Sequence, residues 1–152
     1  GVDKILICAR RTAQIVTLIE DTDFGNELQS RGYSWMYITS ATGAYVNGVQ
    51  VDRKDFFNTL TAWGNEKGKK FIVMHHSILS EGINVPGLEA AIFLRNMNHT
   101  TISQTIGRVI RTGDVDKKFG IVCVPVYDRV GISTSKRVSA VVDHVFQESV
   151  VH

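Results

Sequence analysis

The chain has 152 residues, of which 43% are hydrophobic and 21% charged, a composition that suits one globular core and excludes disordered and collagen-like chains. Its 17 basic and 15 acidic residues give a net charge of +2, which neither requires nor excludes a nucleic-acid partner. No apolar run approaches the roughly 20 residues that cross a bilayer, so we expect no membrane partner. The chain begins with Gly1 rather than methionine, and we expect residues 1–152 to be one domain excised from a longer protein.

Two cysteines, Cys8 and Cys123, lie far apart in separate apolar runs and form no C-x-x-C pair. This arrangement is typical of buried thiols in a reducing compartment rather than of a disulfide scaffold. The first residues also lack the features of a secretory signal peptide. We therefore expect a cytoplasmic protein.

The apolar pattern predicts short strands that alternate with helices. Taken in chain order, the predicted elements are a strand over 4–10, a helix from 11 to 19, a strand over 33–39, loops over 40–43 and 47–48, a helix after Asp52, strands over 71–74 and 90–94, a helix over 100–111, a strand over 120–124 and a final helix. Asp52 is the predicted N-cap of the helix that carries Phe56 and Leu60. Ser133 or Ser135 is the predicted N-cap of the last helix, whose inward residues are Val138, Val141, Val142, Val145 and Phe146.

This alternation predicts an α/β fold: a single domain with a mostly parallel sheet and helices on both faces. We find no internal repeat and no linker in the sequence. In such sheets, ligands bind at the carboxyl ends of the strands. Residues that directly follow the predicted strands are therefore the first candidates for a functional site.

The segment Gln104–Arg111, with the sequence QTIGRVIR, carries the most specific chemical pattern. On a helix, Gln104, Arg108 and Arg111 fall within about 60° of one another, and the apolar residues of the segment fall on the opposite side. Guanidinium groups are suited to bidentate capture of phosphate oxygens, and the small Gly107 lets a ligand come close. Two arginines alone more often form a solvated basic stripe, but the complete Q-x-x-G-R-x-x-R string favours a phosphate site.

Gln104–Arg111 resembles motif VI of superfamily 2 helicases, and the remaining motifs follow in the order of that family. Ser77–Pro86 (SILSEGINVP) resembles motif V, and Lys4–Arg11 is similar to the less specific motif IV. The resemblance covers roughly Lys4 to Tyr127. It implies that the chain is the second RecA-like lobe of an ATP-dependent helicase or translocase.

The resemblance also implies roles for individual residues. Arg111 and Arg108 would be arginine fingers that reach the γ-phosphate of ATP, and Gln104 would orient the attacking water or contact the same phosphate. Gly82, Asn84 and Gly107 would lie near the nucleotide at the lobe interface. ATP and Mg²⁺ would be held mainly by the partner, the N-terminal RecA-like lobe of the same protein, because this chain has no G-x-x-x-x-G-K-[ST] loop and no Asp-Glu dipeptide.

The second partner that the resemblance implies is nucleic acid. Its phosphates would contact residues at the strand ends, which are Arg10, Arg11, Thr39, Ser40 and Ser77. The sequence Gly82-Ile83-Asn84 resembles that of phage recombination helicases, which favours DNA over RNA and a bacterial or phage-infected cell. The family most often has Asp at the position of Asn84, and its motif V threonine aligns with His76.

Three weaker patterns have simpler interpretations. His75, His76 and His99 could suggest a metal site, but adjacent strand residues point to opposite faces and no other ligand has suitable spacing, so we expect no metal. Helical spacing places Phe56, Phe57 and Trp63 in the core rather than on a platform for base stacking. The lysines at 67, 69 and 70 are typical of a solvated turn.

Two other functions remain open. A motor subunit of a restriction system would share these motifs and would be distinguished by a nuclease domain elsewhere in its gene. A stand-alone α/β binding module could use Arg108 and Arg111 to hold a phosphorylated ligand. A phosphate loop and an acidic motif upstream of Gly1 would favour the helicase over the binding module.

Overall fold

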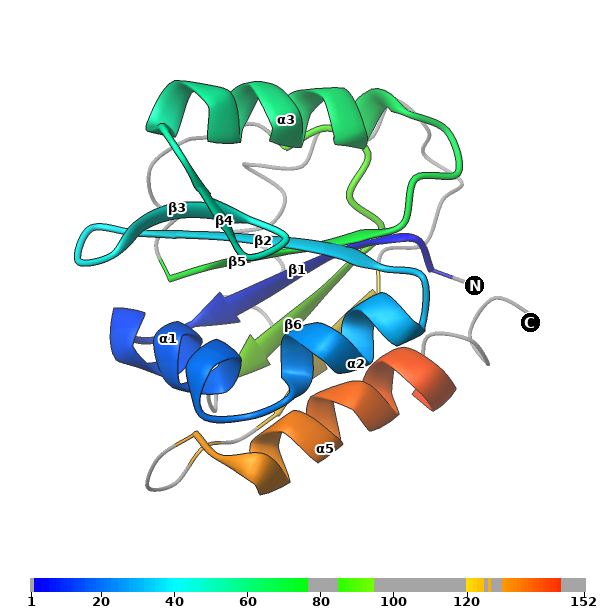
Figure 1. Ribbon diagram of the computed structural model, residues 1–152. Helices are drawn as coiled ribbons and strands as arrows, with labels where there is room; N and C mark the ends of the chain where they lie inside the picture. Colours follow the sequence, from blue (N-terminus) through cyan, green and yellow to red (C-terminus); the bar gives the residue numbers. More distant parts are fainter. Residues whose placement is uncertain (1, 77–84, 95–119, 125, 127–129, 146–152) are drawn as a thin grey trace.

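The computed structural model describes residues 2–76, 85–94, 120–124, 126 and 130–145. Within these ranges the chain forms a seven-stranded sheet in the order β4-β3-β2-β5-β1-β6-β7, with helices on both faces (Figure 1). The α/β class, the mostly parallel sheet and its two helical layers confirm the predicted architecture. No helix in these ranges has the length and apolar character needed to cross a membrane.

All five predicted strands are present, and they form the parallel part of the sheet. They are β1 (Lys4–Ala9), β2 (Ser34–Thr39), β5 (Phe71–His75), β6 (Ala90–Leu94) and β7 (Gly120–Cys123). In β1, Ile7 is paired with Met74 of β5 on one side and Ile92 of β6 on the other. Every residue of these three strands is buried, because helices cover both faces, and this burial explains their nearly unbroken apolar runs.

A β-hairpin that the sequence did not lead us to expect extends the sheet beyond β2. β3 (Gly43–Val46) is antiparallel to β2, and β4 (Val49–Val51) is antiparallel to β3. Asn47 and Gly48 make the turn between them, with φ angles of 50° and 86°. A two-residue turn with positive φ at both positions matches the twist of a hairpin, and Asn-Gly is the preferred pair for it. The loop prediction at 47–48 is thus confirmed, but it overlooked the strands on either side.

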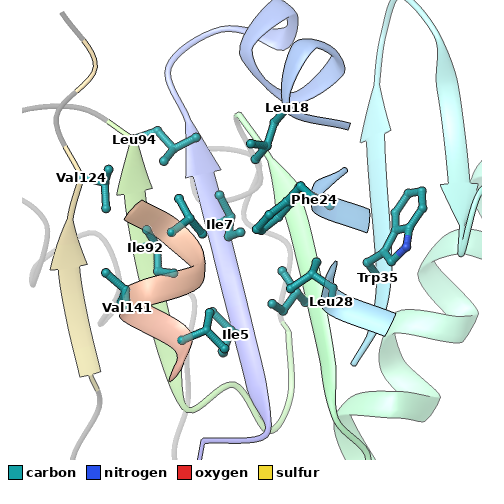
Figure 2. Close-up of a cluster of buried hydrophobic side chains, with 14 of the residues drawn as sticks. Ile5, Ile7, Leu18, Phe24, Leu28, Trp35, Ile92, Leu94, Val124 and Val141 are labelled. Atoms are coloured by element: carbon teal, nitrogen blue, oxygen red, sulfur yellow. The ribbon is translucent and has the colours of Figure 1, made fainter. Parts of the chain in front are cut away.

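Three helices cover one face of the sheet (Figure 1). They are α1 (Thr12–Glu20), α2 (Phe24–Ser30) and α5 (Ile132–Ala140), and α5 continues as a π-helical segment, η1 (Val141–Val145). Figure 2 shows Leu18 of α1, Phe24 of α2 and Val141 of η1 on this face of the sheet, where they belong to one cluster of buried side chains. Val138 and Val142 are buried in the same core, as predicted. The side chain of Val145, and Phe146, lie outside the described residues.

The start of α5 differs from the prediction. Gly131 is the N-cap residue, and neither Ser133 nor Ser135 has that position. Thr134 Oγ1 accepts a hydrogen bond of 3.3 Å from Gly131 N, while Ser135 N donates to Gly131 O at 3.0 Å. Ser133 and Ser135 both follow Gly131 inside the first turns of α5, so neither precedes the helix as a cap must, and Ser135 is buried.

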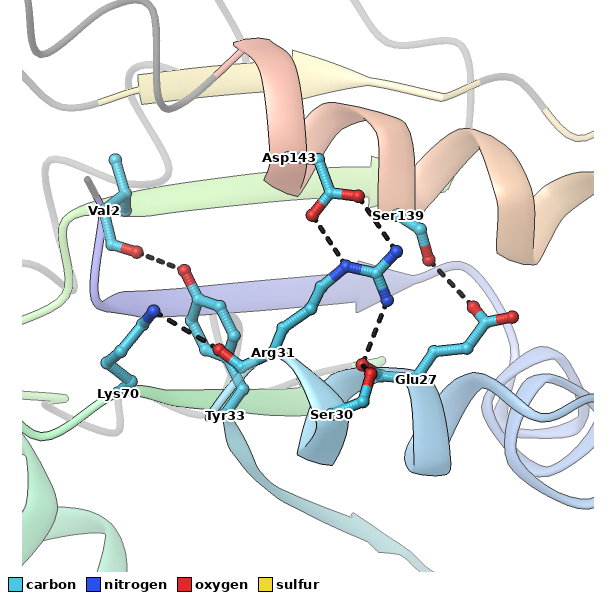
Figure 3. Close-up of polar contacts among 8 residues, drawn as sticks. All are labelled: Val2, Glu27, Ser30, Arg31, Tyr33, Lys70, Ser139 and Asp143. Atoms are coloured by element: carbon cyan, nitrogen blue, oxygen red, sulfur yellow. Dashed lines mark hydrogen bonds and ion pairs between the residues drawn. The ribbon is translucent and has the colours of Figure 1, made fainter.

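Polar contacts tie α2 to the last helical segment (Figure 3). Arg31 donates to both carboxylate oxygens of Asp143, at 2.7 and 2.9 Å, and Ser139 donates to Glu27 at 3.1 Å. The hydrogen bond with Asp143 raises the pKa of Arg31 above its ordinary value. Nearby, Tyr33 donates its phenolic hydrogen to Val2 O, and burial raises its pKa to about 12, so the donor is present at neutral pH. The contacts of Arg31 with Asp143 and of Ser139 with Glu27 join segments that are 112 residues apart in the sequence.

The helix α3 (Arg53–Asn65) covers the opposite face (Figure 1). Asp52 is its N-cap, as predicted, and accepts a hydrogen bond of 2.7 Å from Asp55 N. Phe56 and Leu60 are buried against the sheet, and Phe57 and Trp63 pack at the margin of the same core. The interpretation of these aromatic residues as packing residues is therefore confirmed.

A buried lysine holds the end of α3. Lys4 Nζ donates to the carbonyls of Gly64 at 2.8 Å and Glu66 at 2.6 Å, and the residue is only 6% exposed. Carbonyl groups at the C-terminus of a helix have no partner within the helix and carry partial negative charge. The ammonium group of Lys4 satisfies two of them, so a cation in an otherwise apolar strand connects β1 to α3.

The same end of α3 is in close contact with the loop that leads into β6. A Cβ atom at Gly64 would lie 2.3 Å from Pro86 O, and a Cβ atom at Gly87 would lie 2.1 Å from Gly64 O. Because no side chain fits between the two backbones, both positions require glycine. Val85 and Leu88 on either side of this contact are buried. The loop that leads into β6 is thus anchored on α3.

Candidate nucleic-acid interface

The five parallel strands end along one side of the sheet, which we call the carboxyl edge: the residues that directly follow β1, β2, β5, β6 and β7. The pairs Tyr37–Met74 and Cys8–His75 fix how β2, β5 and β1 lie relative to one another. Continuing this register places the residue after β5, His76, between Thr39 and Ala9, the last residues of β2 and β1. Side chains from three neighbouring strands therefore meet at this part of the carboxyl edge.

Arg10 and Arg11 follow β1, the middle strand of the parallel part of the sheet, and both are exposed. Gln14 of α1 reaches back with Oε1 to accept hydrogen bonds from Arg10 N at 2.9 Å and Arg11 N at 3.1 Å. This contact fixes the backbone between β1 and α1, so the side chains of Arg10 and Arg11 extend from an ordered turn. Exposed guanidinium groups at this position can bind phosphate oxygens.

Thr39 and Ser40, at the end of β2, differ in what they offer to a ligand. Thr39 is 3% exposed, and its Oγ1 lies 2.5 Å from Thr42 Oγ1 and accepts a hydrogen bond of 3.0 Å from Thr42 N. These contacts hold the turn from β2 into β3. Ser40 lies within that turn and is exposed. Thr39 thus positions the turn, and Ser40 presents a hydroxyl group at the surface.

The two adjacent histidines lie on the same side rather than on opposite faces. Their rings are stacked, with centroids 5.4 Å apart and an angle of 18° between the planes. The expectation of opposite faces was wrong because β5 ends at His75 and the chain bends at His76, where the strand alternation no longer applies. His75 is buried, and His76 is partly exposed.

The remaining predicted site residues lie outside the described residues. They are Ser77, Gly82, Asn84, Gln104, Gly107, Arg108 and Arg111, together with the predicted helix over 100–111 and His99. Their roles stay predictions. The structure does describe the loop that follows Asn84, which is anchored on α3 through Pro86 and Gly87.

Two further expectations can be compared with the described residues. No group of three or more His, Cys, Asp or Glu side chains within the described ranges could hold a metal ion. The lysine turn is more ordered than predicted: Lys69 Nζ donates to Ser34 at 3.0 Å and lies 4.5 Å from the centre of the Trp63 ring, and Lys70 lies 4.6 Å from that of Tyr33. Lys69 and Lys70 therefore pack on aromatic rings instead of extending into solvent.

The parallel sheet with helices on both faces defines the fold as that of a RecA-like α/β lobe. Among solved structures, the C-terminal part of the Fun30 ATPase domain is similar to this chain with a TM-score of 0.50 and 15% sequence identity, over 92% of this chain and 48% of that one. The chain thus spans about half the length of that structure. The ATP-dependent Type ISP restriction-modification enzyme LlaBIII, bound to DNA, matches with a TM-score of 0.46 and 16% identity, over 94% of this chain and 10% of that one. No protein-family model matches the sequence, and no curated protein was found to be similar to it.

Proposed function

We propose that this chain is the second RecA-like lobe of an ATP-dependent superfamily 2 helicase or translocase, with DNA favoured over RNA. The observation that carries the proposal is the carboxyl edge, where two exposed arginines follow β1, the middle strand of the parallel part of a RecA-like sheet. The fold similarity to the C-terminal part of an ATPase domain and the motif VI string Gln104–Arg111 support it.

In this proposal the lobe completes a nucleotide site that the N-terminal lobe provides. ATP and Mg²⁺ belong to that first lobe. Arg108 and Arg111 approach the γ-phosphate when the lobes close, and their fixed positive charge stabilises the charge of the phosphoryl group in transit. Gln104 orients the attacking water, and the small residues Gly82 and Gly107 leave room for the nucleotide beside Asn84.

The carboxyl edge contacts nucleic acid through its phosphates. A motor that advances along a strand must accept any base, so its contacts go to the repeating backbone rather than to base edges. The exposed side chains of Arg10, Arg11 and Ser40 are suited to this role, and together they form the proposed phosphate track. Ser77 is the further residue that we assign to this track from the sequence. Thr39 contributes by holding the turn that carries Ser40.

Removing the two arginines should flatten the salt dependence of DNA binding. Each phosphate neutralised on a single strand contributes about −0.7 to the slope of log affinity against log salt concentration. With Arg10 and Arg11 as the main cations, we expect a slope of about −1.4 for the chain and a slope near zero for the Arg10→Ala/Arg11→Ala variant. The measurement is a salt titration of the binding of fluorescent single-stranded oligonucleotides, followed by anisotropy.

Lys67→Ala is the matched control, because Lys67 is an exposed cation in the turn that precedes β5, at the opposite end of that strand from the carboxyl edge. This variant should keep the slope of the unmodified chain. Oligonucleotides of different sequence should bind alike. A slope that is unchanged in the double variant, or a strong preference for one sequence, would contradict the proposed phosphate track.

The chain alone should bind ATP weakly and hydrolyse none. The groups that position ATP and Mg²⁺ do most of the work of phosphoryl transfer, and the sequence contains neither the phosphate loop nor the acidic motif that would provide them. The measurement is phosphate release by the purified chain with Mg²⁺, with and without single-stranded DNA. Robust Mg²⁺-dependent turnover would overturn the two-lobe proposal.

A further inference from the structure

A cleft of about 280 Å³, open to solvent, lies on the helical face that carries α1, α2 and α5. One wall is the turn from α1 into α2, and the other is the beginning of α5, with Ile132, Ser135 and Lys136. We call it the α1–α5 cleft. Pockets for small-molecule ligands usually have volumes of about 300–1,000 Å³, so this cleft suits a smaller group, such as one long side chain.

The charge of the α1–α5 cleft is strongly negative. Four carboxylates line it, and the lining contains a single cation; these residues are Glu20, Asp21, Asp23, Glu27 and Lys136. Within the described ranges none of the five takes part in an ion pair. The negative charge is therefore not neutralised by the chain itself, so the cleft attracts cations and repels nucleic acid.

Two of these carboxylates are placed where they do not stabilise the fold. Glu20 is the last residue of α1 and Asp21 is its C-cap, and the last turn of this helix has no basic residue. Because the C-terminus of a helix carries partial negative charge, acidic side chains are unfavourable there. The end of α1 thus adds to the negative potential of the cleft, and a bound cation would relieve the repulsion.

A buried hydroxyl group provides a further acceptor. Ser135 lines the cleft although it is only 3% exposed, and its side chain makes no hydrogen bond within the part of the chain that the structure describes. Because buried polar groups are nearly always hydrogen-bonded in proteins, this hydroxyl group is suited to an N–H donor from a ligand. Glu27 is oriented by the hydrogen bond of 3.1 Å that its Oε2 accepts from Ser139 (Figure 3).

The arrangement suits an extended cation better than a metal ion. No group of His, Cys, Asp and Glu side chains in the described ranges converges closely enough to hold a metal. A guanidinium group is always charged and has several N–H donors in one plane, so it can reach acceptors on both walls of a cleft. Ile132, which is 63% exposed, adds an apolar surface beside the charge.

We infer that the α1–α5 cleft is a docking site for a partner protein, which inserts an arginine side chain from a basic segment. The carboxylates surround the guanidinium group, and Ile132 contacts an apolar residue next to the arginine. This apolar contact favours a peptide segment over a free polyamine. The inference is independent of the proposed function, because the carboxyl edge binds anions and the cleft binds a cation.

The test uses the peptide acetyl-Leu-Arg-Leu-amide and its neutral counterpart, in which citrulline replaces arginine. Each is titrated into the complete chain while ¹H–¹⁵N NMR spectra are recorded. We expect the arginine peptide to shift the signals of residues 20–23 and 132–136 and to bind at least about fivefold more tightly than the citrulline peptide. Asp21→Asn/Asp23→Asn should weaken binding of the arginine peptide by about fivefold or more.

The asparagine substitutions keep the shape of both side chains, and Asp23 makes no side-chain cap to α2, so the variant should fold normally. Glu66→Gln is the matched control, because it removes an exposed carboxylate beyond the end of α3, on the opposite face of the sheet; its affinity should not change.

Four outcomes would overturn the inference. Two of them are equal binding of the arginine and citrulline peptides, and unchanged binding by Asp21→Asn/Asp23→Asn. The third is a shift of the same NMR signals by Mg²⁺ alone, which would show a metal site. The fourth is self-association of the chain that Asp21→Asn/Asp23→Asn abolishes, which would show that a second copy occupies the cleft.

Discussion

Replacing Arg111 by alanine in the two-lobe protein should lower the rate of ATP turnover by about 10³-fold or more, the magnitude associated with arginine fingers. Arg111 is predicted to lie on the helix face opposite the apolar residues, so its removal should leave folding nearly unchanged. The interaction matters most in the transition state, so nucleotide binding should weaken much less than turnover. Steady-state ATP hydrolysis and nucleotide titration of the same variant measure the two effects.

Arg111→Lys provides a sharper comparison than alanine alone. Lysine keeps the positive charge but lacks the planar, bidentate guanidinium group, so we expect it to recover only a small part of the lost rate. Lys67→Ala, which removes an exposed charge at the turn before β5, should keep the turnover of the unmodified protein. Normal ATP turnover by Arg111→Ala would mean that Arg108 and Arg111 form only a surface stripe, and an unfolded variant would contradict the placement of Arg111 opposite the apolar face.

Replacing Gly64 by alanine should reduce the free energy of unfolding by at least about 2 kcal/mol. Two effects oppose each other: alanine favours a helix over glycine by about 1 kcal/mol, whereas its methyl group overpacks the contact with the loop before β6. The overpacking should dominate, because the new Cβ atom would lie 2.3 Å from Pro86 O, a backbone atom that cannot rotate away. Urea denaturation measures the change in free energy, and we expect the thermal midpoint to fall by about 4–8 °C.

Gly131→Ala is the matched control for Gly64→Ala. A Cβ atom at Gly131 meets no other atom within 4 Å, and its φ of −159° suits any residue. We expect a change of less than about 1 kcal/mol in this variant. Equal stability of Gly64→Ala and Gly131→Ala would contradict the close packing of α3 on the loop before β6.

The sheet could be predicted from sequence because its strands are buried on both faces. β1, β5 and β6 have apolar side chains at nearly every position, and this signal does not depend on the rest of the fold. The N-cap Asp52 was predictable for a similar reason, since a capping side chain acts within one helical turn. The role of Lys4 in holding the end of α3 was not predictable, because its partners there are about 60 residues away in the sequence.

The sequence did not predict the helix α2 or the hairpin β3–β4, because the elements are short and one of them depends on a tertiary contact. Gly25 weakens the helical pattern of α2, yet glycine is needed there because a Cβ atom would lie 3.0 Å from the Trp35 ring. In the hairpin, Asn47 and Gly48 gave a turn signal, but the four- and three-residue strands beside it were too short to show clear alternation.

The candidate site was predictable where it follows from topology. Parallel strands end on one side of a sheet, so the placement of Arg10, Arg11 and Ser40 at one edge followed from the strand prediction alone. The surroundings of individual side chains did not follow. The hydroxyl group of Thr39 is hydrogen-bonded to Thr42 only because the chain turns into β3 there. The stacking of His75 on His76 depends on where β5 ends.

The most direct test of the two-lobe proposal is ATP turnover as a function of DNA concentration in a polypeptide that carries both lobes. We expect single-stranded DNA to stimulate turnover. The Arg10→Ala/Arg11→Ala variant should need several-fold more DNA for half-maximal stimulation while its turnover without DNA stays unchanged. Two results would contradict the assignment of this chain as the second lobe of a nucleic-acid motor. One is ATP turnover that does not change with DNA concentration, and the other is a double variant that responds to DNA like the unmodified protein.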